Sequence, residues 1–255
     1  MSKLYTTDAI ILTAKDYRDY DKLLTLFSPE HGRISAIVKG VKKPKSKLSG
    51  IVQSFTYGRY QLYLGKSLDR LVQGTVYNGF GHLKGDLMKM SAGMCVLELL
   101  DKSVLREQES GALFGVTLSC FYLLEKDYPL QLPLRIFEAK LIDHLGYAPD
   151  LSGCLHHGEV ASARWYFDPD QGGIVCEPCF EELCSAQESP QAFLLERSSL
   201  NIMDRLLNSP VYQLKNLKMT DVQNDTVERV FTSILRAHAG ITCKTKSFLE
   251  TMNRS

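Results

Sequence analysis

Residues 23–38, LLTLFSPEHGRISAIV, decide how the first part of this chain folds. Two short runs rich in apolar and β-branched residues, 23–27 and 34–38, flank the segment Pro29-Glu30-His31-Gly32. Proline and glycine at such positions are typical of a tight turn, and short runs of this composition are typical of strands. The stretch therefore predicts two strands joined by a turn.

Three more runs of the same kind surround this pair, at residues 9–13, 55–64 and 71–77. A longer basic loop, residues 40–50, joins the third run to the fourth. Five short strands in about 80 residues suit a small Greek-key barrel of the oligonucleotide-binding (OB) kind, because closure removes most exposed strand edges. The pattern alone leaves an SH3-like barrel as an alternative.

The hydrophobic period changes after Asn78-Gly79-Phe80-Gly81. Apolar residues then recur at helical spacing, and the stripes are Leu87, Met90, Met94, Leu97 and Leu100, then Leu113, Val116, Cys120 and Leu124. Further helices are predicted at 134–145, at 199–207 and from a cap at Thr220 or Asp221 to Gly240. The sequence predicts an α+β protein with an OB-fold nucleic-acid-binding domain at 1–80 and a helical domain at 81–255.

The composition is that of an ordinary globular protein, with 44% hydrophobic and 23% charged residues among 255. The apolar run at residues 9–12 is too short for the core of a signal peptide, and no run of about 18 apolar residues could span a membrane. We therefore expect a cytoplasmic protein with no membrane association.

Charge is distributed unevenly along this nearly neutral chain. Residues 1–80 contain 13 Lys and Arg against 6 Asp and Glu, whereas residues 150–200 contain 2 against 9. Local charge predicts a partner better than net charge does. The acidic segment around Glu177, Glu181 and Glu182 has two interpretations, a solvated face or a docking surface for a basic partner.

The basic charge is concentrated between residues 33 and 47, a segment that contains no acid. The next predicted strand adds an arginine and several tyrosines. Lysines neutralise phosphates and aromatic faces accept stacked bases, so this combination predicts a nucleic-acid groove. The candidate contacts are Arg33, Lys39, Lys42, Lys43, Lys45, Lys47, Arg59 and Tyr57. The alternative is a solvated loop, with at least half of the tyrosines packed in the core.

Four possible metal ligands occur as two close pairs, Cys154-x2-His157 and Cys176-x2-Cys179, separated by 18 residues. Paired knuckles of this kind predict a tetrahedral zinc site, with Gly158, Gly172 and Gly173 supplying the turns. Four protein ligands leave no position for water, so the predicted Zn²⁺ is structural. The predicted zinc module occupies residues 147–185 within the helical domain.

Other interpretations of this segment stay open. His156 could replace His157, and Cys184 could replace one of the other thiolates. The four residues could also lie near the surface without a metal, and Cys176-x2-Cys179 could be a redox pair. The redox interpretation is disfavoured because no βαβ pattern surrounds the two cysteines.

Motifs typical of enzymes are absent from the sequence. Gly65-Lys66-Ser67 resembles the end of a phosphate-binding loop, but Tyr60 stands where the first glycine of that motif is required. No G-x-S-x-G, H-E-x-x-H or G-x-G-x-x-G segment occurs. The sequence therefore predicts a protein that is not an enzyme.

Several of the quoted segments resemble the N-terminal barrel of the RecO family of bacterial DNA repair proteins. They are DAIIL at 8–12, DKLLTLFS at 21–28, HGRISA at 31–36 and VKG at 38–40. The resemblance continues through the basic loop, the helical middle and the Gly172-Gly173 pair before Cys176. Many members of the family have four cysteines in the zinc module, whereas this chain has His157 at the second ligand position.

The resemblance implies a recombination mediator that binds single- and double-stranded DNA and anneals complementary strands. It implies that RecR is a partner, that the C-terminal tail of single-strand-binding protein (SSB) docks on the helical domain, and that RecA is loaded indirectly. It also implies association with the nucleoid. Two other hypotheses are an RNA-binding OB-fold adaptor and a zinc-dependent nucleic-acid-processing enzyme.

Overall fold

The two strands predicted around the Pro29–Gly32 turn are β2 and β3, and they pair in an antiparallel hairpin. The computed structural model describes residues 3–158, 162–186 and 191–253. Its backbone contacts divide into two compact units, residues 3–127 with 243–253, and residues 128–242. Within the described ranges, no helix is both long and apolar enough to cross a membrane.

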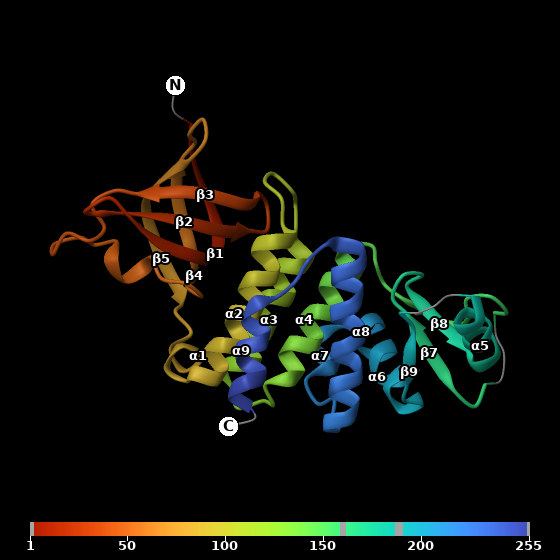
Figure 1. Ribbon diagram of the computed structural model, residues 1–255. Coiled ribbons are helices and arrows are strands. Elements are labelled where there is room, and N and C mark those ends of the chain that lie inside the picture. Colours follow the sequence, from red (N-terminus) through yellow and green to blue (C-terminus); the bar gives the residue numbers. More distant parts are fainter. Residues whose placement is uncertain (1–2, 159–161, 187–190, 254–255) are drawn as a thin grey trace. The chain divides into compact units, whose positions relative to one another are not determined.

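The first unit contains a closed barrel of five strands in the order β1-β2-β3-β5-β4, drawn in red to orange in Figure 1. The strands are β1 (Leu4–Tyr17), β2 (Asp21–Ser28), β3 (Gly32–Val38), β4 (Tyr57–Tyr63) and β5 (Asp69–Asn78). β1 closes the barrel because its first half pairs with β4 and its second half with β2. A short parallel pairing of β3 with β5 completes the ring. The predicted OB-type barrel is therefore confirmed.

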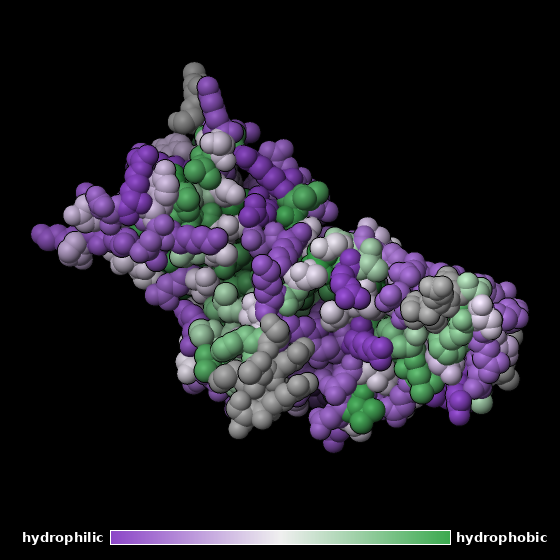
Figure 2. Space-filling view, in the orientation of Figure 1, coloured by the Kyte–Doolittle hydropathy of each residue, from purple (hydrophilic) through white to green (hydrophobic). Residues whose placement is uncertain are grey.

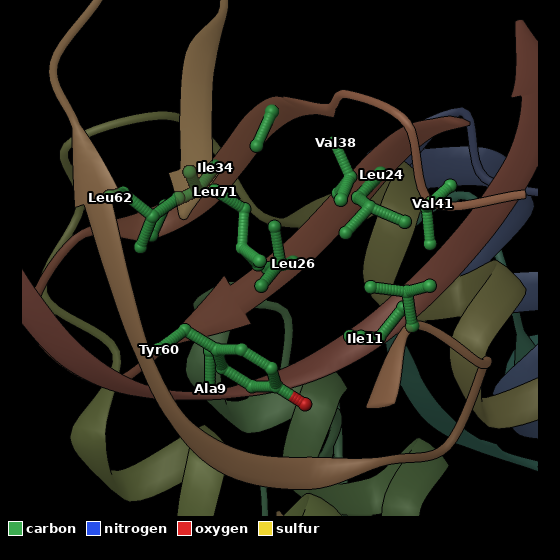
Figure 3. Packing of buried hydrophobic residues seen from close by; sticks show 12 residues of the cluster. Ala9, Ile11, Leu24, Leu26, Ile34, Val38, Val41, Tyr60, Leu62 and Leu71 are labelled. Atoms are coloured by element: carbon green, nitrogen blue, oxygen red, sulfur yellow. The ribbon is translucent and has the colours of Figure 1, made fainter. Parts of the chain in front are cut away.

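The barrel core is built from the alternate side chains that the strand pattern predicts. In β3 every second residue is buried, as the two-residue period of a strand requires. Figure 3 shows the side chains of this cluster pointing into the barrel. The cluster consists of Ala9, Ile11, Leu24, Leu26, Ile34, Ala36, Val38, Val41, Val52, Tyr60, Leu62 and Leu71.

The fourth strand begins later than the sequence predicts. Residues 55 and 56 were expected to belong to it, but Phe55 has φ of 70°, a conformation that no strand allows. Its ring is buried and lies 5.5 Å from the ring of Phe121. Packing against a helix has therefore taken precedence over the local preference of phenylalanine for a strand.

In its described residues the first unit also contains four helices: α1 (Gly81–Gly85), α2 (Leu87–Ser103), α3 (Gly111–Glu125) and α9 (Lys244–Asn253). A 3-10 turn, η1 (Ser49–Ile51), lies in the loop between β3 and β4. The barrel packs against α3: Phe27 of β2 contacts Phe114 of α3, with ring centroids 5.5 Å apart. The β2–β3 turn rests on the loop after α2, because Arg33 N donates to Leu105 O at 3.1 Å.

The C-terminal helix α9 returns to pack against α2, far away in the sequence. Glu98 of α2 accepts hydrogen bonds from the Lys244 and Thr245 backbone amides, both at 2.9 Å. The Thr245 hydroxyl also donates to this carboxylate, at 2.7 Å. Glu98 therefore caps the N-terminus of a helix that begins 146 residues later.

The second unit combines a helical layer with a small sheet. Its helices are α4 (Gln131–His144), α5 (Glu177–Ala186), α6 (Arg197–Asn208), α7 (Val211–Leu214) and α8 (Asp221–Ala239). Thr220 caps α8 in a capping box with Gln223, and Gly240 ends it in a left-handed conformation, as the sequence predicts. Arg135 of α4 is buried and pairs with Glu228 of α8 at 2.9 Å, so the two helices are joined by charge as well as by apolar packing.

The sheet of this unit has the order β6-β8-β7-β9. Its strands are β6 (Asp150–Cys154), β7 (Trp165–Asp168), β8 (Gly173–Cys176) and β9 (Phe193–Leu195). Gly158 and Gly172 have positive φ and make turns, as predicted, but Gly173 begins a strand instead. A Cβ on Gly173 would lie 2.6 Å from the Leu155 side chain, so close packing, and not a turn, requires this glycine.

Candidate nucleic-acid interface and metal centre

The cationic loop, residues 39–47, leaves the barrel beside the 18–20 turn that joins β1 to β2. Lys42 N donates to Tyr20 O at 3.0 Å, and Gly40 N donates to Asp21 Oδ1 at 2.8 Å. These bonds tie the start of the loop to the turn. The loop projects from the barrel at the left of Figure 1, and hydrophilic residues cover that projection in Figure 2.

Three lysines of the cationic loop are exposed and have no partner among the described residues: Lys39, Lys45 and Lys47. Lys43 is also exposed, and its Nζ lies 5.7 Å from the centroid of the Tyr20 ring. An ammonium group at the surface keeps its charge in water and attracts anions without a fixed geometry. These four lysines are therefore available to a polyanion.

Lys42 is held by a carboxylate. Its Nζ lies 2.8 Å from Asp16 Oδ2, and Lys22 Nζ lies 3.5 Å from Asp16 Oδ1. The hydrogen bond from Lys42 is the main cause that lowers the pKa of Asp16. Asp16 thus lies between two lysines and makes charge-assisted contacts with both.

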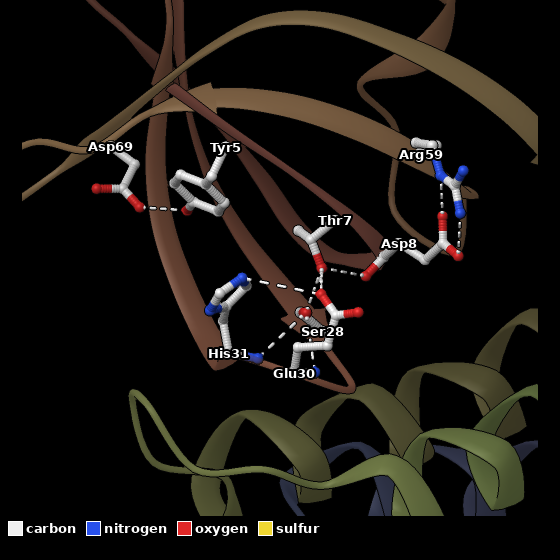
Figure 4. A network of polar contacts seen from close by, with 8 residues as sticks. All are labelled: Tyr5, Thr7, Asp8, Ser28, Glu30, His31, Arg59 and Asp69. Carbon is white, nitrogen blue, oxygen red and sulfur yellow. Dashed lines mark hydrogen bonds and ion pairs between the residues drawn. The ribbon is translucent and has the colours of Figure 1, made fainter. Parts of the chain in front are cut away.

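The two arginines predicted for the interface lie elsewhere on the barrel, in ion pairs. Arg33 Nε donates to Asp101 Oδ1 of α2 at 2.8 Å. Arg59 makes a two-bond pair with Asp8, at 2.8 and 3.0 Å, which Figure 4 shows on the outside of neighbouring strands. Neither arginine belongs to the group that the structure gathers around the cationic loop.

The predicted aromatic contact, Tyr57, is half-buried in an aromatic cluster. Its ring lies 5.1 Å from that of Tyr77 and 5.9 Å from that of Phe114, both in edge-to-face arrangements. Tyr60, on the same strand, is fully buried in the barrel core. Packing therefore uses the rings of both tyrosines.

The sequence prediction did not include two exposed cations at this end of the barrel or a third on β5. Lys15 and Arg18 are exposed at the end of β1 and in the turn after it, and Arg70 is exposed on β5 opposite Ile37 of β3. Strand alternation could have placed Lys15 and Arg70 on the outer face of the sheet. No sequence pattern reveals that β5 lies beside β3, because the two strands are parallel and distant in the chain.

The second candidate site is a cluster of four side chains, Cys154, His157, Cys176 and Cys179, in the second unit. Cys154 ends β6, Cys176 ends β8, and Cys179 lies in the first turn of α5. A tight turn with reciprocal backbone hydrogen bonds of 2.7 Å between Cys154 and Gly158 brings His157 to the cluster. The possible ligand atoms all lie within 4.8 Å of one another.

The separations of these atoms fit a tetrahedral metal centre. Zn–S bonds of about 2.3 Å and Zn–N bonds of about 2.0–2.1 Å at tetrahedral angles place two thiolates about 3.8 Å apart and a thiolate about 3.6 Å from an imidazole nitrogen. The Cys154–Cys179 and Cys176–Cys179 Sγ separations are 3.7 and 3.6 Å. His157 Nδ1 lies 3.6 Å from Cys176 Sγ and 3.4 Å from Cys179 Sγ. The group could hold one metal ion, with His157 using Nδ1.

The pKa values of two thiols in the cluster are shifted in opposite directions. Burial raises the pKa of Cys154, but backbone amides of Cys176, His156 and His157 outweigh it and lower the pKa to about 6. Burial and the neighbouring thiols raise the pKa of Cys179 to about 12. Thiolates crowded in this way repel one another unless a metal ion neutralises them.

The alternative ligands differ in their position relative to this cluster. The cluster among the described residues contains His157 and not His156, and it does not contain Cys184, which is exposed on α5. Four protein ligands would fill a tetrahedral coordination sphere.

Comparison with known proteins identifies the family of this chain. Residues 1–80 match the family described as Recombination protein O N terminal, and residues 84–247 match Recombination protein O C terminal. This chain belongs to the RecO family. It is 38% identical over 218 residues to the DNA repair protein RecO of Desulfitobacterium hafniense, which covers 84% of this chain and 78% of that protein.

Other RecO proteins align over nearly the whole chain. The DNA repair protein RecO of Heliobacterium modesticaldum is 32% identical over 259 residues, covering 99% of this chain and 92% of that protein. That of Desulforamulus reducens is 28% identical over 254 residues, covering 99% and 96%. DNA repair is therefore the functional class of this RecO-family chain.

Proposed function

We propose that this RecO-family protein is a recombination mediator that binds single- and double-stranded DNA and anneals complementary strands. In this role it works with RecR to load RecA onto single strands coated by SSB, whose C-terminal tail docks on the helical domain. The protein acts in the cytoplasm, at the nucleoid. The observation that carries the DNA-binding part is the group of exposed lysines around the cationic loop in a chain of this family.

The physical basis of annealing is the neutralisation of phosphate charge. Two complementary strands repel each other through their backbones, and lysines that replace condensed counterions reduce this repulsion. Base pairing then supplies the specificity, so the protein has no need to read bases in order to anneal strands. The formation of base pairs lowers the free energy of the strands, so annealing requires no nucleotide hydrolysis. This is consistent with a protein that is not an enzyme.

The metal in the second unit is proposed to be Zn²⁺. Soft thiolates and an imidazole are the ligands that zinc prefers, and closed four-ligand sites of this type stabilise small modules. Bound zinc would cross-link the ends of β6 and β8 to the start of α5. Its role would be to hold the fold of this module, with no part in a reaction.

The test of the proposed DNA site compares two triple variants that remove the same charge. One changes Lys39, Lys45 and Lys47 to Ala, and the other changes Lys126, Lys215 and Lys218, which are exposed elsewhere. Affinity for a single-stranded oligonucleotide is measured by fluorescence anisotropy over a range of salt concentrations. Each lost phosphate contact should make the slope of log K against log salt shallower by about 0.7.

We expect the first variant to bind weakly with a shallower salt dependence and the second to bind like the wild type. Equal behaviour of the two variants would exclude the cationic loop as the DNA site. The same titration with RNA of equal length separates the alternative function, since an adaptor that recognises the 2'-hydroxyl would bind RNA more tightly.

A further inference from the structure

The most exposed aromatic ring beside the cationic loop is that of Tyr20, which the sequence did not single out. Tyr20 is 52% exposed and lies in the turn between β1 and β2. Tyr57 is packed against two other rings, and Tyr60 is in the barrel core. Tyr63 is 37% exposed, but it pairs with Leu4 at the opposite end of β1. Tyr20 alone of these four combines exposure with a place beside the cationic loop.

The surroundings of Tyr20 hold it against the lysines. Its carbonyl accepts the 3.0 Å hydrogen bond from Lys42 N, and the Nζ of Lys43 lies 5.7 Å from the centroid of its ring. The neighbouring residue Arg18 has a left-handed backbone, with φ of 53°, and its guanidinium lies 5.1 Å from the Tyr17 ring. The exposed cation Lys43 and the exposed Tyr20 ring thus lie side by side.

We propose that Tyr20 stacks on an unpaired base of a nucleic acid whose phosphates are bound by the lysines of the cationic loop. This inference rests on the proposed function and gives that site a preference for single strands. Bases stack on aromatic rings whatever their identity, because every base has a π face. Bases inside a duplex have both faces covered by their neighbours, so a duplex offers the ring nothing to stack on except at its ends.

Charge and stacking would then contribute to different parts of the binding. The lysines bind single and double strands alike, because both present phosphates. Tyr20 adds stacking free energy to the binding of an unpaired base, and salt screens this contribution little. The surface should therefore release a duplex more readily than a single strand once annealing is complete.

The test uses full-length protein, three Tyr20 variants and three DNA probes. The variants are Tyr20→Ala, Tyr20→Leu, which keeps apolar bulk without a ring, and Tyr20→Phe, which keeps the ring. Tyr63→Ala is the matched control, since it removes an exposed tyrosine at the opposite end of β1. The probes are an oligothymidylate, a strand of equal length made only of abasic sugar phosphates, and a blunt duplex of equal length.

We expect Tyr20→Ala and Tyr20→Leu to weaken binding of the oligothymidylate by about 5- to 100-fold, the effect of losing one base–aromatic stack. The abasic strand and the duplex should change by less than about twofold. Tyr20→Phe and Tyr63→Ala should bind like the wild type. The slope of log K against log salt should stay unchanged in all Tyr20 variants, because no charge is lost.

An equal loss on the abasic strand or the duplex would overturn the inference, because it would mean that the ring merely supports the loop. No loss on the oligothymidylate would overturn it as well. The two proposals fail in different ways. If the Lys39, Lys45 and Lys47 triple variant binds normally, the proposed DNA site fails; if that variant is weak and Tyr20→Ala is normal, only the stacking role fails.

Discussion

Lys42 Nζ lies 2.8 Å from Oδ2 of Asp16, so a lysine of the cationic loop is already engaged by a carboxylate of the same barrel. Lys22 reaches the other oxygen of Asp16 at 3.5 Å. A carboxylate between two lysines competes with any phosphate that approaches them. Asp16 should therefore limit the affinity of this surface for DNA.

Replacing Asp16 with Asn should tighten binding of single-stranded DNA by about two- to fivefold at low salt, the range expected for release of an exposed ion pair. The effect should fade as salt screens the charges. Fluorescence anisotropy at several salt concentrations measures it. Asp19→Asn removes the same charge from the neighbouring turn, where Asp19 has no partner within the described residues, and should have a smaller effect. Identical gains in both variants would point to net charge alone.

The metal centre gives a second prediction, based on two adjacent histidines. His157→Ala should reduce the amount of zinc that copurifies with the protein and weaken zinc binding in a competition with a chelating dye, because one of four ligands is lost. His156→Ala should retain the metal, since His156 lies outside the cluster. Metal content by atomic spectroscopy measures the difference. Retention of zinc by the first variant and loss by the second would reverse the ligand assignment.

The third prediction concerns Glu98, the cap of α9. Burial raises the pKa of Glu98, but hydrogen bonds from Lys102, the Lys244 amide and Thr245 outweigh it and hold the pKa well below its ordinary value. A lowered pKa in the folded state stabilises the protein above the carboxyl pKa of the unfolded chain, about 4.3, and this contribution is lost as the pH falls below that value.

Glu98→Gln should therefore destabilise the docking of α9 at pH 7 by about 1–2 kcal/mol, the effect of weakened charge-assisted hydrogen bonds. Hydrogen exchange of the α9 amides should be faster in the variant at neutral pH, and the difference should shrink as the pH is lowered through 4. Glu109→Gln, at an exposed position before α3, is the control. A difference between Glu98→Gln and wild type that grows towards acid pH would contradict the capping role.

The fourth prediction concerns Gly32, where the β2–β3 turn meets the loop after α2. Gly32 has φ of 60°, and a Cβ there would lie 2.4 Å from Leu105 O and 2.7 Å from Gln108 O, both backbone atoms. Gly32→Ala should lower the free energy of unfolding by at least about 2 kcal/mol, because it combines an unfavourable φ with contacts that no side-chain rotation relieves. Chemical denaturation measures the loss. Gly50→Ala, in open space, should be neutral.

Local patterns in the sequence were enough for the barrel strands, for the longer helices and for the spacing of the candidate metal ligands, but they did not predict the sheet β6–β9. The alternation in β3 has the two-residue period of a strand, and the 3.6-residue spacing of apolar residues predicted the helix α2; both periods depend only on neighbours in the chain. The spacing did not give the buried face of α2, because Leu87 and Met94 of the predicted stripe are exposed. The cluster of Cys154 and Cys179 followed from spacing, because each pair of ligands lies within one turn or at one strand end. The composition of residues 39–47 was also enough to predict a cationic loop.

The tertiary structure decided which charges and rings are available. Arg33 and Arg59 could not be distinguished from Lys45 in the sequence, because their partners Asp101 and Asp8 are 68 and 51 residues away. The sequence also could not predict that α9 packs against α2, because Glu98 and the helix that it caps are 146 residues apart. Composition fixes how much charge a segment carries, but whether that charge is free depends on contacts between distant segments, which form only when the chain has folded.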